Sequence, residues 1–277
     1  MLNPKVDLAF KKLFGVEENN DILMSFINSV VDEKDQVKDI RLKNPYNDKN
    51  FKNDKLSILD IKAQDAITDK WYNIEMQMVD QDYYDKRALY YWARLYIGQL
   101  GTGVIYSKLE KTICINILNF SCIEGEEHYH NTYKLHNTKS KNVFFDDLEI
   151  HFIELTKYHE EVRNLLDKWV LFLKDVDVFE KMSDKLEEVD TIKKAVEVLE
   201  HMSLTKEERE RYEARLGWLW DEELALEKAE KKGVEKGEKK KAIEIAKNLL
   251  SLNVDIKIIS KSSGLSVDEI EKLIENL

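Results

Sequence analysis

The chain is poor in residues that interrupt regular structure or cross-link small domains. Only two prolines, nine glycines and two cysteines occur among its 277 residues. So few turn-forming residues predict a chain built mostly of helices and strands. Two cysteines, Cys114 and Cys122, are too few for a disulfide framework or a cysteine-rich zinc site. Cys114 lies in an apolar run and is predicted to be a buried thiol, which suits a reducing compartment.

Long apolar segments are also missing from the sequence. No uninterrupted apolar run approaches the ~18 residues that a membrane-spanning helix needs. The N-terminal residues 1–12 include the charged Lys5 and do not contain the apolar segment of a signal peptide. We therefore expect a cytoplasmic protein with no membrane partner.

A basic excess, the usual mark of a nucleic-acid-binding protein, is absent as well. The formal net charge is −11, and it is unevenly spread: residues 1–174 carry −4, residues 175–227 carry −9 and residues 228–277 carry +2. Most of the negative charge therefore lies outside the N-terminal part. Even so, the lack of a strong basic footprint counts against tight nonspecific binding to DNA.

Hydrophobic periodicity predicts an ordered mixture of helices and strands. Asn3 and Pro4 are interpreted as the N-cap and first residue of a helix that ends at Gly15. Helices are predicted at residues 3–15, 20–31, 83–100, 160–173, 184–202 and from 206 to 227 or beyond. Strands are predicted at residues 37–42, 56–65, 71–79, 112–120, 127–135 and 148–155.

Two of these strands form a predicted hairpin that carries paired carboxylates. Asp60 lies in the first strand and Glu75 in the second, and apolar residues flank both on the opposite face. Carboxylates side by side on paired strands would repel each other. A hard divalent cation such as Mg²⁺ removes that cost, because it prefers oxygen ligands and leaves room for water and a substrate phosphate.

The neighbours of the two carboxylates are polar too. Lys62 and Gln77 each lie two residues along the same strand face from a carboxylate. Either side chain could orient an attacking water, and Lys62 could stabilise developing negative charge. The alternative is a solvated sheet face, on which Asp60 and Glu75 are exposed and Lys62 pairs with one of them.

Several segments together resemble a known nuclease family. One pattern resembles the D…(D/E)-x-K core of the PD-(D/E)XK nuclease superfamily: Asp60, then fourteen intervening residues, then Glu75-Met-Gln77. The fuller pattern is similar to the Rpn family of recombination-promoting nucleases and transposases. It is carried, over roughly residues 3–230, by Asp7-Leu-Ala-Phe-Lys-Lys-Leu-Phe-Gly15, Leu59-Asp-Ile61, Asn73-Ile-Glu-Met-Gln77, Lys86-Arg-Ala-Leu-Tyr-Tyr91 and Gly101-Thr-Gly-Val-Ile-Tyr106.

The resemblance implies an α/β fold with a restriction-endonuclease-like core and a helical C-terminal extension. The core is expected at residues 1–158, the helical extension at 159–230, and a charged tether with a small helical module at 231–277. Asp60 and Glu75 would bind Mg²⁺, or alternatively Mn²⁺, with the Met76 carbonyl as a further ligand. Gln77 stands where the superfamily has lysine, and Lys62 is the candidate replacement.

Three further residues are weaker candidates. Asp7 could lie near the metal site from the first helix, although a first-turn aspartate favoured by the helix dipole explains it equally well. Arg87 and Arg94 are seven residues apart and share a helical face, from which they could contact DNA phosphates. The plainer interpretation makes them surface arginines over a tyrosine-rich packing face.

Signals outside the hairpin are limited. His128 and His130 alternate on a predicted strand, but no third ligand follows at a tight spacing. Two capping boxes are predicted, at Thr205 with Glu208 and at Ser266 with Glu269. The C-terminal segment around Gly264 has the length of a helix-turn-helix, yet its second helix is acidic. A packing or oligomerisation module is therefore favoured over a DNA reader.

The leading functional hypothesis is a Mg²⁺-dependent DNA endonuclease linked to recombination or mobile elements. Asp60 and Glu75 would hold the metal, with Gln77 positioning water and Lys62 assisting. The alternative is a catalytically inactive nuclease fold that binds DNA or protein. An RNA-directed nuclease fits the sequence equally well. The C-terminal helices are the predicted contact of a homodimer.

Overall fold

The computed structural model describes residues 1–44, 61–80, 83–101, 103, 105–159, 161–174 and 189–275. It divides into two compact units, Met1–Leu216 and Gly217–Leu277. The helix α9 (Lys206–Ser251) begins in the first unit and ends in the second. The predicted three-part division at residues 158 and 230 remains a prediction.

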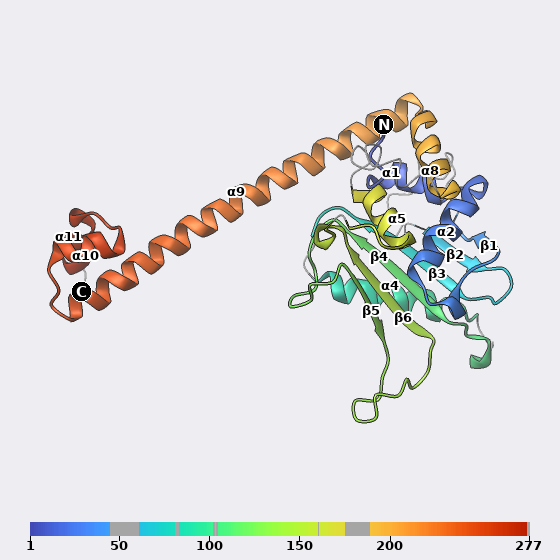
Figure 1. The fold of residues 1–277 in the computed structure, drawn as a ribbon, viewed down its shortest axis with the longest axis horizontal. Helices are drawn as coiled ribbons and strands as arrows, with labels where there is room; N and C mark the ends of the chain where they lie inside the picture. The colour runs from blue at the N-terminus through green and yellow to red at the C-terminus, as the bar shows by residue number, and fades with distance from the viewer. Residues whose placement is uncertain are drawn as a thin grey trace. The chain divides into compact units, whose positions relative to one another are not determined.

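The first unit is built on one six-stranded mixed sheet (Figure 1). Its order is β1-β2-β3-β4-β6-β5. The pairs β3–β4 and β4–β6 are parallel, whereas the outer pairs are antiparallel. The strands are β1 (Ile40–Leu42), β2 (Ile61–Asp65), β3 (Trp71–Gln77), β4 (Thr112–Leu118), β5 (His130–Lys134) and β6 (Leu148–Glu154). Each lies within a segment that alternation and apolar runs predicted.

Helices cover both faces of this sheet. On one face lie α1 (Asp7–Phe14), α2 (Asn20–Val30), α5 (Leu165–Lys174) and α8 (Asp190–His201). On the other face α4 (Tyr84–Ile97) packs on β3, β4 and β6. All seven residues of β4 are buried, as an apolar central strand covered on both sides requires. The α/β class predicted from the sequence is confirmed.

The larger core lies between the sheet and the four-helix layer. Five aromatic side chains there pack ring against ring, with centroids 4.9–6.0 Å apart: Phe10, Phe14, Phe26, Trp169 and Phe172. These rings meet the sheet residues Ile61, Ile74 and Ile115 in the same cluster. A smaller core lies under α4, where Trp92 donates a hydrogen bond to the Thr112 carbonyl at 2.9 Å.

Helix α1 begins later than the sequence predicted. Asn3 and Pro4 are not its N-cap and first residue, because the helix starts at Asp7 after Val6. The Asn3 side chain instead accepts a hydrogen bond from the Lys5 amide at 3.0 Å, which turns the chain before the helix. Gly15 ends the helix as expected, with its N–H bonded to the Lys11 carbonyl.

Two other helices differ from their predicted limits. Helix α5 begins at Leu165 rather than at residue 160, because Asn164 and Asp167 exchange capping hydrogen bonds at its start. Helix α8 begins at Asp190, and residues 184–188 of the predicted helix lie outside the described residues. The charged segment 228–241, most of which lies in the predicted tether that begins at residue 231, is helical throughout.

The second unit has its own small core. The end of α9 packs with α10 (Ile256–Ser263) and α11 (Val267–Glu275) around Ala246, Ile259, Leu265 and Ile270. Gly264 ends α10 with a φ of 79°, a conformation that strongly favours glycine. Among the described residues, no helix is both long and apolar enough to cross a membrane.

Both predicted capping boxes are present. The Thr205 amide donates to Glu208 at 2.8 Å and the Glu208 amide donates to the Thr205 hydroxyl at 3.3 Å. Ser266 and Glu269 exchange the same pair of bonds at 3.0 and 3.3 Å. These reciprocal bonds satisfy N–H groups that a helix start would otherwise leave unpaired.

Candidate active site on the β3 strand

Glu75 lies in β3 on the sheet face that α4 covers. Alternation along the strand puts Ile74 and Met76 into the larger core and Glu75 on the opposite face. The Glu75 side chain is buried, at 2% exposure. The sequence-based alternative of a solvated sheet face with an exposed Glu75 is therefore wrong, because helices cover both faces.

The partner carboxylate of the prediction, Asp60, lies outside the described residues. The described part of β2 begins one residue later, at Ile61, which pairs with Ile74 in an antiparallel register. Ile74 directly precedes Glu75 in β3. The predicted hairpin is thus present, and the structure describes its register from Ile61 onward.

The immediate surroundings of Glu75 are amide side chains. The Asn73 side-chain nitrogen donates to Glu75 Oε1 at 3.1 Å, and Asn73 is fully buried. Asn116 stands opposite Glu75 on β4. The Tyr84 hydroxyl from α4 donates to Asn116 Oδ1 at 3.0 Å. Glu75 therefore has an amide side chain beside it on β3 and another opposite it on β4.

The charge of Glu75 is felt by a neighbouring thiol. Burial raises the pKa of Cys114 strongly, the negative charge of Glu75 raises it further, and a hydrogen bond from Asn73 lowers it in part. Cys114 is 1% exposed, so the predicted buried thiol is confirmed. Such a thiol stays protonated and is not a nucleophile.

Lys62 and Gln77 lie on the same sheet face as Glu75, at different distances from it. Lys62 pairs with Asn73, and its ammonium group lies 4.8 Å from the centroid of the Trp71 ring. Burial lowers the pKa of Lys62, and the nearby charge of Lys43 lowers it further. Trp71 lies on the side of Asn73 away from Glu75, so this Lys62 position does not reach the carboxylate. Gln77 is half-buried at the end of β3.

The weaker candidates occupy different places. Arg87 is half-buried in α4, with its guanidinium 5.2 Å from the Tyr84 ring and 5.4 Å from the Tyr91 ring. Arg94 is exposed on the same helix. Asp7 is in the first turn of α1, and this helix contributes three aromatic or leucine side chains to the core on the opposite sheet face from Glu75. The structure thus groups Arg87 with Tyr84 and Glu75 on the α4 side, and the role of Asp7 stays a prediction.

The donor atoms around Glu75 fit a hard cation. Asn73 Oδ1 is buried and accepts no hydrogen bond from any residue that the structure describes. Its amide nitrogen must face the carboxylate, so the oxygen of the amide is left over as a ligand atom. Carboxylate and amide oxygens are the ligands that Mg²⁺ and similar ions accept in proteins.

A second group of acids suits a metal less well. Asp32, Asp35 and Glu149 offer oxygens within 4.8 Å of one another among the described residues. Glu149 lies on the opposite sheet face from Glu75, because it pairs with Ile113 of the larger core. Lysines already neutralise this group: Lys111 lies 2.6 Å from both Asp35 and Glu149, Lys70 lies 2.8 Å from Asp35, and Lys134 lies 2.9 Å from Asp32. A divalent cation would have to displace these ammonium groups.

This second group is a buried ion-pair network. His151 Nε2 lies 2.8 Å from Glu149 Oε1, and His130 Nε2 lies 2.9 Å from His151 Nδ1. Burial would raise the pKa of Glu149, but hydrogen bonds from His151 and Lys111 outweigh it and lower the pKa well below its usual range. Burial and the neighbouring His151 lower the pKa of His130 to about 4. Of the two alternating histidines, His130 thus contacts His151 within this network.

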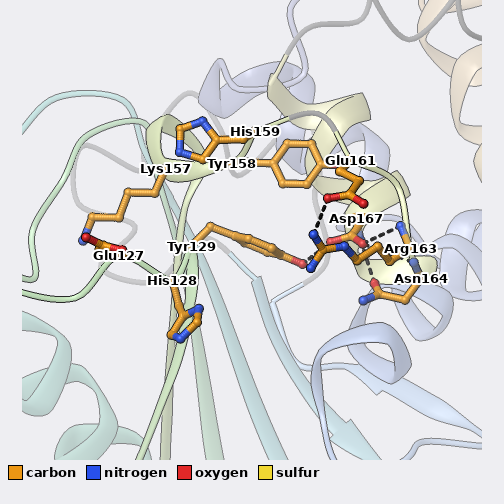
Figure 2. Close-up of a pocket in the computed structure, with 10 residues that line it drawn as sticks. All are labelled: Glu127, His128, Tyr129, Lys157, Tyr158, His159, Glu161, Arg163, Asn164 and Asp167. Carbon is orange, nitrogen blue, oxygen red and sulfur yellow. Dashed lines mark hydrogen bonds and ion pairs between the residues drawn. The ribbon is translucent and has the colours of Figure 1, made fainter.

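A surface cleft lies at the β5 edge of the sheet, with β4 and β6 between it and β3 (Figure 2). Its floor holds Tyr129, whose hydroxyl donates to Asp167, and Asp167 also accepts from the Arg163 amide at 2.8 Å. Burial raises the pKa of Tyr129, and the hydrogen bond to Asp167 raises it further. Because Asp167 caps α5 with these bonds, the cleft is explained as the packing of a helix start.

Sequence reasoning missed Asn73, Asn116 and Tyr84. The signal for Asn116 was available, because it is a polar residue inside the otherwise apolar run Thr112–Phe120. Asn73 was visible as a further polar residue on the face of Glu75. Tyr84 could not be found that way, since its contact with Asn116 spans 32 residues and depends on how α4 docks.

Comparison with known proteins gives one match. A family model described as PD-(D/E)XK nuclease family transposase matches residues 4–229. No curated protein and no solved structure matched the chain significantly. The matched range includes the whole sheet and α4, and therefore every described residue around Glu75.

Proposed function

Because the chain belongs to the PD-(D/E)XK nuclease family transposases, we propose that it is a Mg²⁺-dependent DNA endonuclease. One structural observation supports this choice above the others: Glu75 is a buried carboxylate on β3, next to the Ile61–Ile74 pair of the hairpin. A buried charged side chain without a functional role is costly to retain. We extend the proposal to a cytoplasmic role in recombination or in mobile elements.

Asp60 and Glu75 are the proposed metal ligands. Asp60 directly precedes Ile61 in the sequence. Ile61 in turn pairs with Ile74, the neighbour of Glu75. We propose the Met76 carbonyl as a further ligand and Mn²⁺ as an alternative ion. The bound ion would lower the pKa of a water and stabilise negative charge on the attacked phosphate.

The chain's own side chains have separate proposed roles. Gln77, two residues beyond Glu75 on the same face, would orient the attacking water through its amide. Lys62 would assist by leaving Trp71 for the developing negative charge. The charged ammonium form of Lys62 would carry this role, and the flexible side chain permits the movement. Asn73 would hold the Glu75 carboxylate in place through its 3.1 Å hydrogen bond.

DNA is the proposed partner, contacted from α4. Arg94 is exposed and would pair with a phosphate. Arg87 stacks on Tyr84 and Tyr91, so its guanidinium has a fixed plane that suits phosphate recognition. Asp7 is retained as an auxiliary residue only. Its placement on α1 favours the plainer role of interacting with the helix dipole.

Cleavage of supercoiled plasmid with and without Mg²⁺ tests the proposal. Wild type is expected to nick or linearise the plasmid only with the metal. Glu75→Gln and Asp60→Asn are expected to lose at least about 100-fold, more than loss of an outer-shell partner usually costs. Asp69→Asn, an exposed acid in the turn of the same hairpin, is the matched control. Equal and negligible cutting by wild type and Glu75→Gln would overturn the enzymatic proposal.

A second candidate function is a catalytically silent nuclease fold that binds DNA or protein. Two observations favour it: Gln77 replaces the superfamily lysine, and Lys62 lies over Trp71 rather than toward Glu75. Titration calorimetry separates the candidates. Binding of Mg²⁺ or Mn²⁺ that disappears in Glu75→Gln supports the nuclease, whereas the absence of binding in wild type supports the silent fold.

A further inference from the structure

The connection between β5 and β6 exposes an unusual group of apolar side chains. It extends beyond the ends of both strands (Figure 1). One of these side chains lies near the end of β5 and four lie in the connection. Their exposed fractions are 43% for Tyr133, 42% for Leu135, 45% for Val143, 80% for Phe144 and 37% for Phe145. Single exposed hydrophobic residues are normal, but a contiguous group marks an interaction surface. We call residues 133–145 the β5–β6 hairpin loop.

The loop is held in shape by its own hydrogen bonds. Asn137 Oδ1 accepts from the amides of Lys139 at 2.9 Å and Ser140 at 3.0 Å. His136 and Val143 form an isolated β-bridge across the loop. The Phe144 ring packs edge-on against Phe145, with centroids 5.4 Å apart. The aromatic side chains are therefore presented in a fixed arrangement, which lowers the entropy cost of binding a partner.

The base of the loop is anchored to the sheet. Asp146 pairs with Lys34 and with Lys111, the latter at 3.2 Å. Asp147 accepts a hydrogen bond from the Tyr96 hydroxyl of α4 at 2.6 Å. Burial and this bond raise the pKa of Tyr96 to about 12, so it remains a donor at neutral pH. Both acids at the base of the loop, Asp146 and Asp147, thus interact with groups of the protein itself.

The exposed part of the loop is cationic in an acidic protein. Residues 130–145 contain no aspartate or glutamate, whereas the whole chain has a net charge of −11. Lys139 and Lys141 are exposed, and they lie within five residues of Phe144 in the sequence. A polyanion with stackable rings complements such a surface, because lysines pair with phosphates and aromatic rings stack on bases. A symmetric contact between two copies would instead bring these lysines against each other.

We propose that the β5–β6 hairpin loop is a DNA-contacting element, in which Lys139 and Lys141 bind phosphates and Phe144 stacks on a base. The inference rests on the proposed function for the identity of the polyanion. Tyr133 packs on Phe152 with ring centroids 5.8 Å apart, and Phe152 lies on the face of Glu75.

DNA binding without cleavage tests the loop directly. The full-length protein is titrated into a fluorescein-labelled DNA duplex in EDTA, over a series of salt concentrations. The variants are Phe144→Ala and the double variant Lys139→Gln with Lys141→Gln. Matched controls are Leu224→Ala, which removes an exposed apolar side chain of α9, and Lys206→Gln with Lys247→Gln, which removes two exposed charges of α9.

The two loop variants are expected to differ in kind. Phe144→Ala should weaken binding by about 5- to 150-fold, the range for loss of one base stack, and leave the salt dependence unchanged. The double lysine variant should reduce the slope of log affinity against log salt by about 1.8, because two phosphate contacts are lost. The control variants should match wild type in both quantities.

Three results would overturn the inference. In the first, the loop variants bind DNA with the affinity and salt dependence of wild type. In the second, wild type does not bind DNA. In the third, the loop variants lose self-association in sedimentation but keep their DNA affinity. The last would make the loop an interface between copies. Failure of the nuclease proposal is distinguishable, because a wild type that binds DNA through the loop yet never cuts plasmid with Mg²⁺ leaves this inference intact.

Discussion

At the residue scale, the burial of Glu75 sets a balance between stability and metal binding. Its carboxylate is 2% exposed and accepts a hydrogen bond from the neutral amide of Asn73. Taking a carboxylate out of water is unfavourable unless charge or hydrogen bonds compensate it. A bound cation at this position would therefore stabilise the folded state by more than its contacts alone suggest.

Glu75→Gln should reverse that balance. Without metal, the variant is expected to have an unfolding midpoint equal to or above that of wild type, since a buried charge is removed. Mg²⁺ at about 100 times its Kd should stabilise wild type by about 2.7 kcal/mol, a shift of several degrees, and leave the variant unchanged. Differential scanning calorimetry measures both. A Mg²⁺ shift in Glu75→Gln equal to that of wild type or Asp69→Asn would contradict the assignment.

Lys62 shows what residue-level reasoning from sequence could not provide. Alternation correctly predicted its sheet face. The direction of a long side chain depends on its neighbours in space, however. The Lys62 ammonium group lies over the Trp71 ring, two residues along β3 from Asn73, with which Lys62 pairs. The role of Lys62 as a catalytic assistant stays a prediction.

At the element scale, the β5–β6 pair carries a pH-sensitive contact. His130 has a pKa lowered to about 4 by burial and by His151, against the opposing charges of Glu149 and Asp32. The unfolded chain protonates His130 near its ordinary pKa of about 6.5. The contribution of neutral His130 to the free energy of unfolding is therefore fully present above pH 6.5. It is lost as the pH falls toward 4.

The expected loss between pH 7 and pH 5 is on the order of 1–2 kcal/mol of unfolding free energy. Urea unfolding at several pH values measures it. His130→Asn should flatten this dependence, whereas His128→Asn, which changes an exposed histidine of the same segment, should retain it. A steep pH dependence that persists unchanged in His130→Asn would show that another group is responsible.

The start of α9 depends on its capping box. Thr205→Ala removes the hydroxyl that accepts from the Glu208 amide and should cost about 1 kcal/mol of unfolding free energy. Thr205→Ser keeps the hydroxyl and is the control. Thermal or urea unfolding compares the three proteins. Equal stability of Thr205→Ala and Thr205→Ser would mean that the cap contributes nothing.

At the scale of the whole molecule, the second unit presents apolar side chains that its own core does not use. Leu252 is 72% exposed, Ile258 is 57% exposed and Ile274 is 45% exposed. We therefore retain the sequence-based prediction of a homodimer formed through the C-terminal helices. Sedimentation should give twice the chain mass of 32.7 kDa.

The double variant Ile258→Asp with Ile274→Asp should sediment as a monomer, because charges at a buried contact oppose association. Leu224→Ala, on the exposed part of α9, is the control and should remain dimeric. A monomeric wild type at micromolar concentration would remove the prediction. So would a double variant that stays dimeric.

The sequence by itself determined where the strands, most helices and both capping boxes lie. Those features depend on periodicity and on residues three or four positions apart, which a single chain segment contains. It also identified Glu75 and its strand face. Its family pattern predicted the match over residues 4–229.

Only the tertiary structure decided burial and long-range pairing. Glu75 is buried because α4 docks over its face, and no local pattern reveals that docking. Lys111 reaches Asp35 across 76 residues, which turns an apparent metal cluster into an ion-pair network. Charges far apart in sequence compensate each other only once the chain has folded, so their partners depend on the packing of elements rather than on the order of residues.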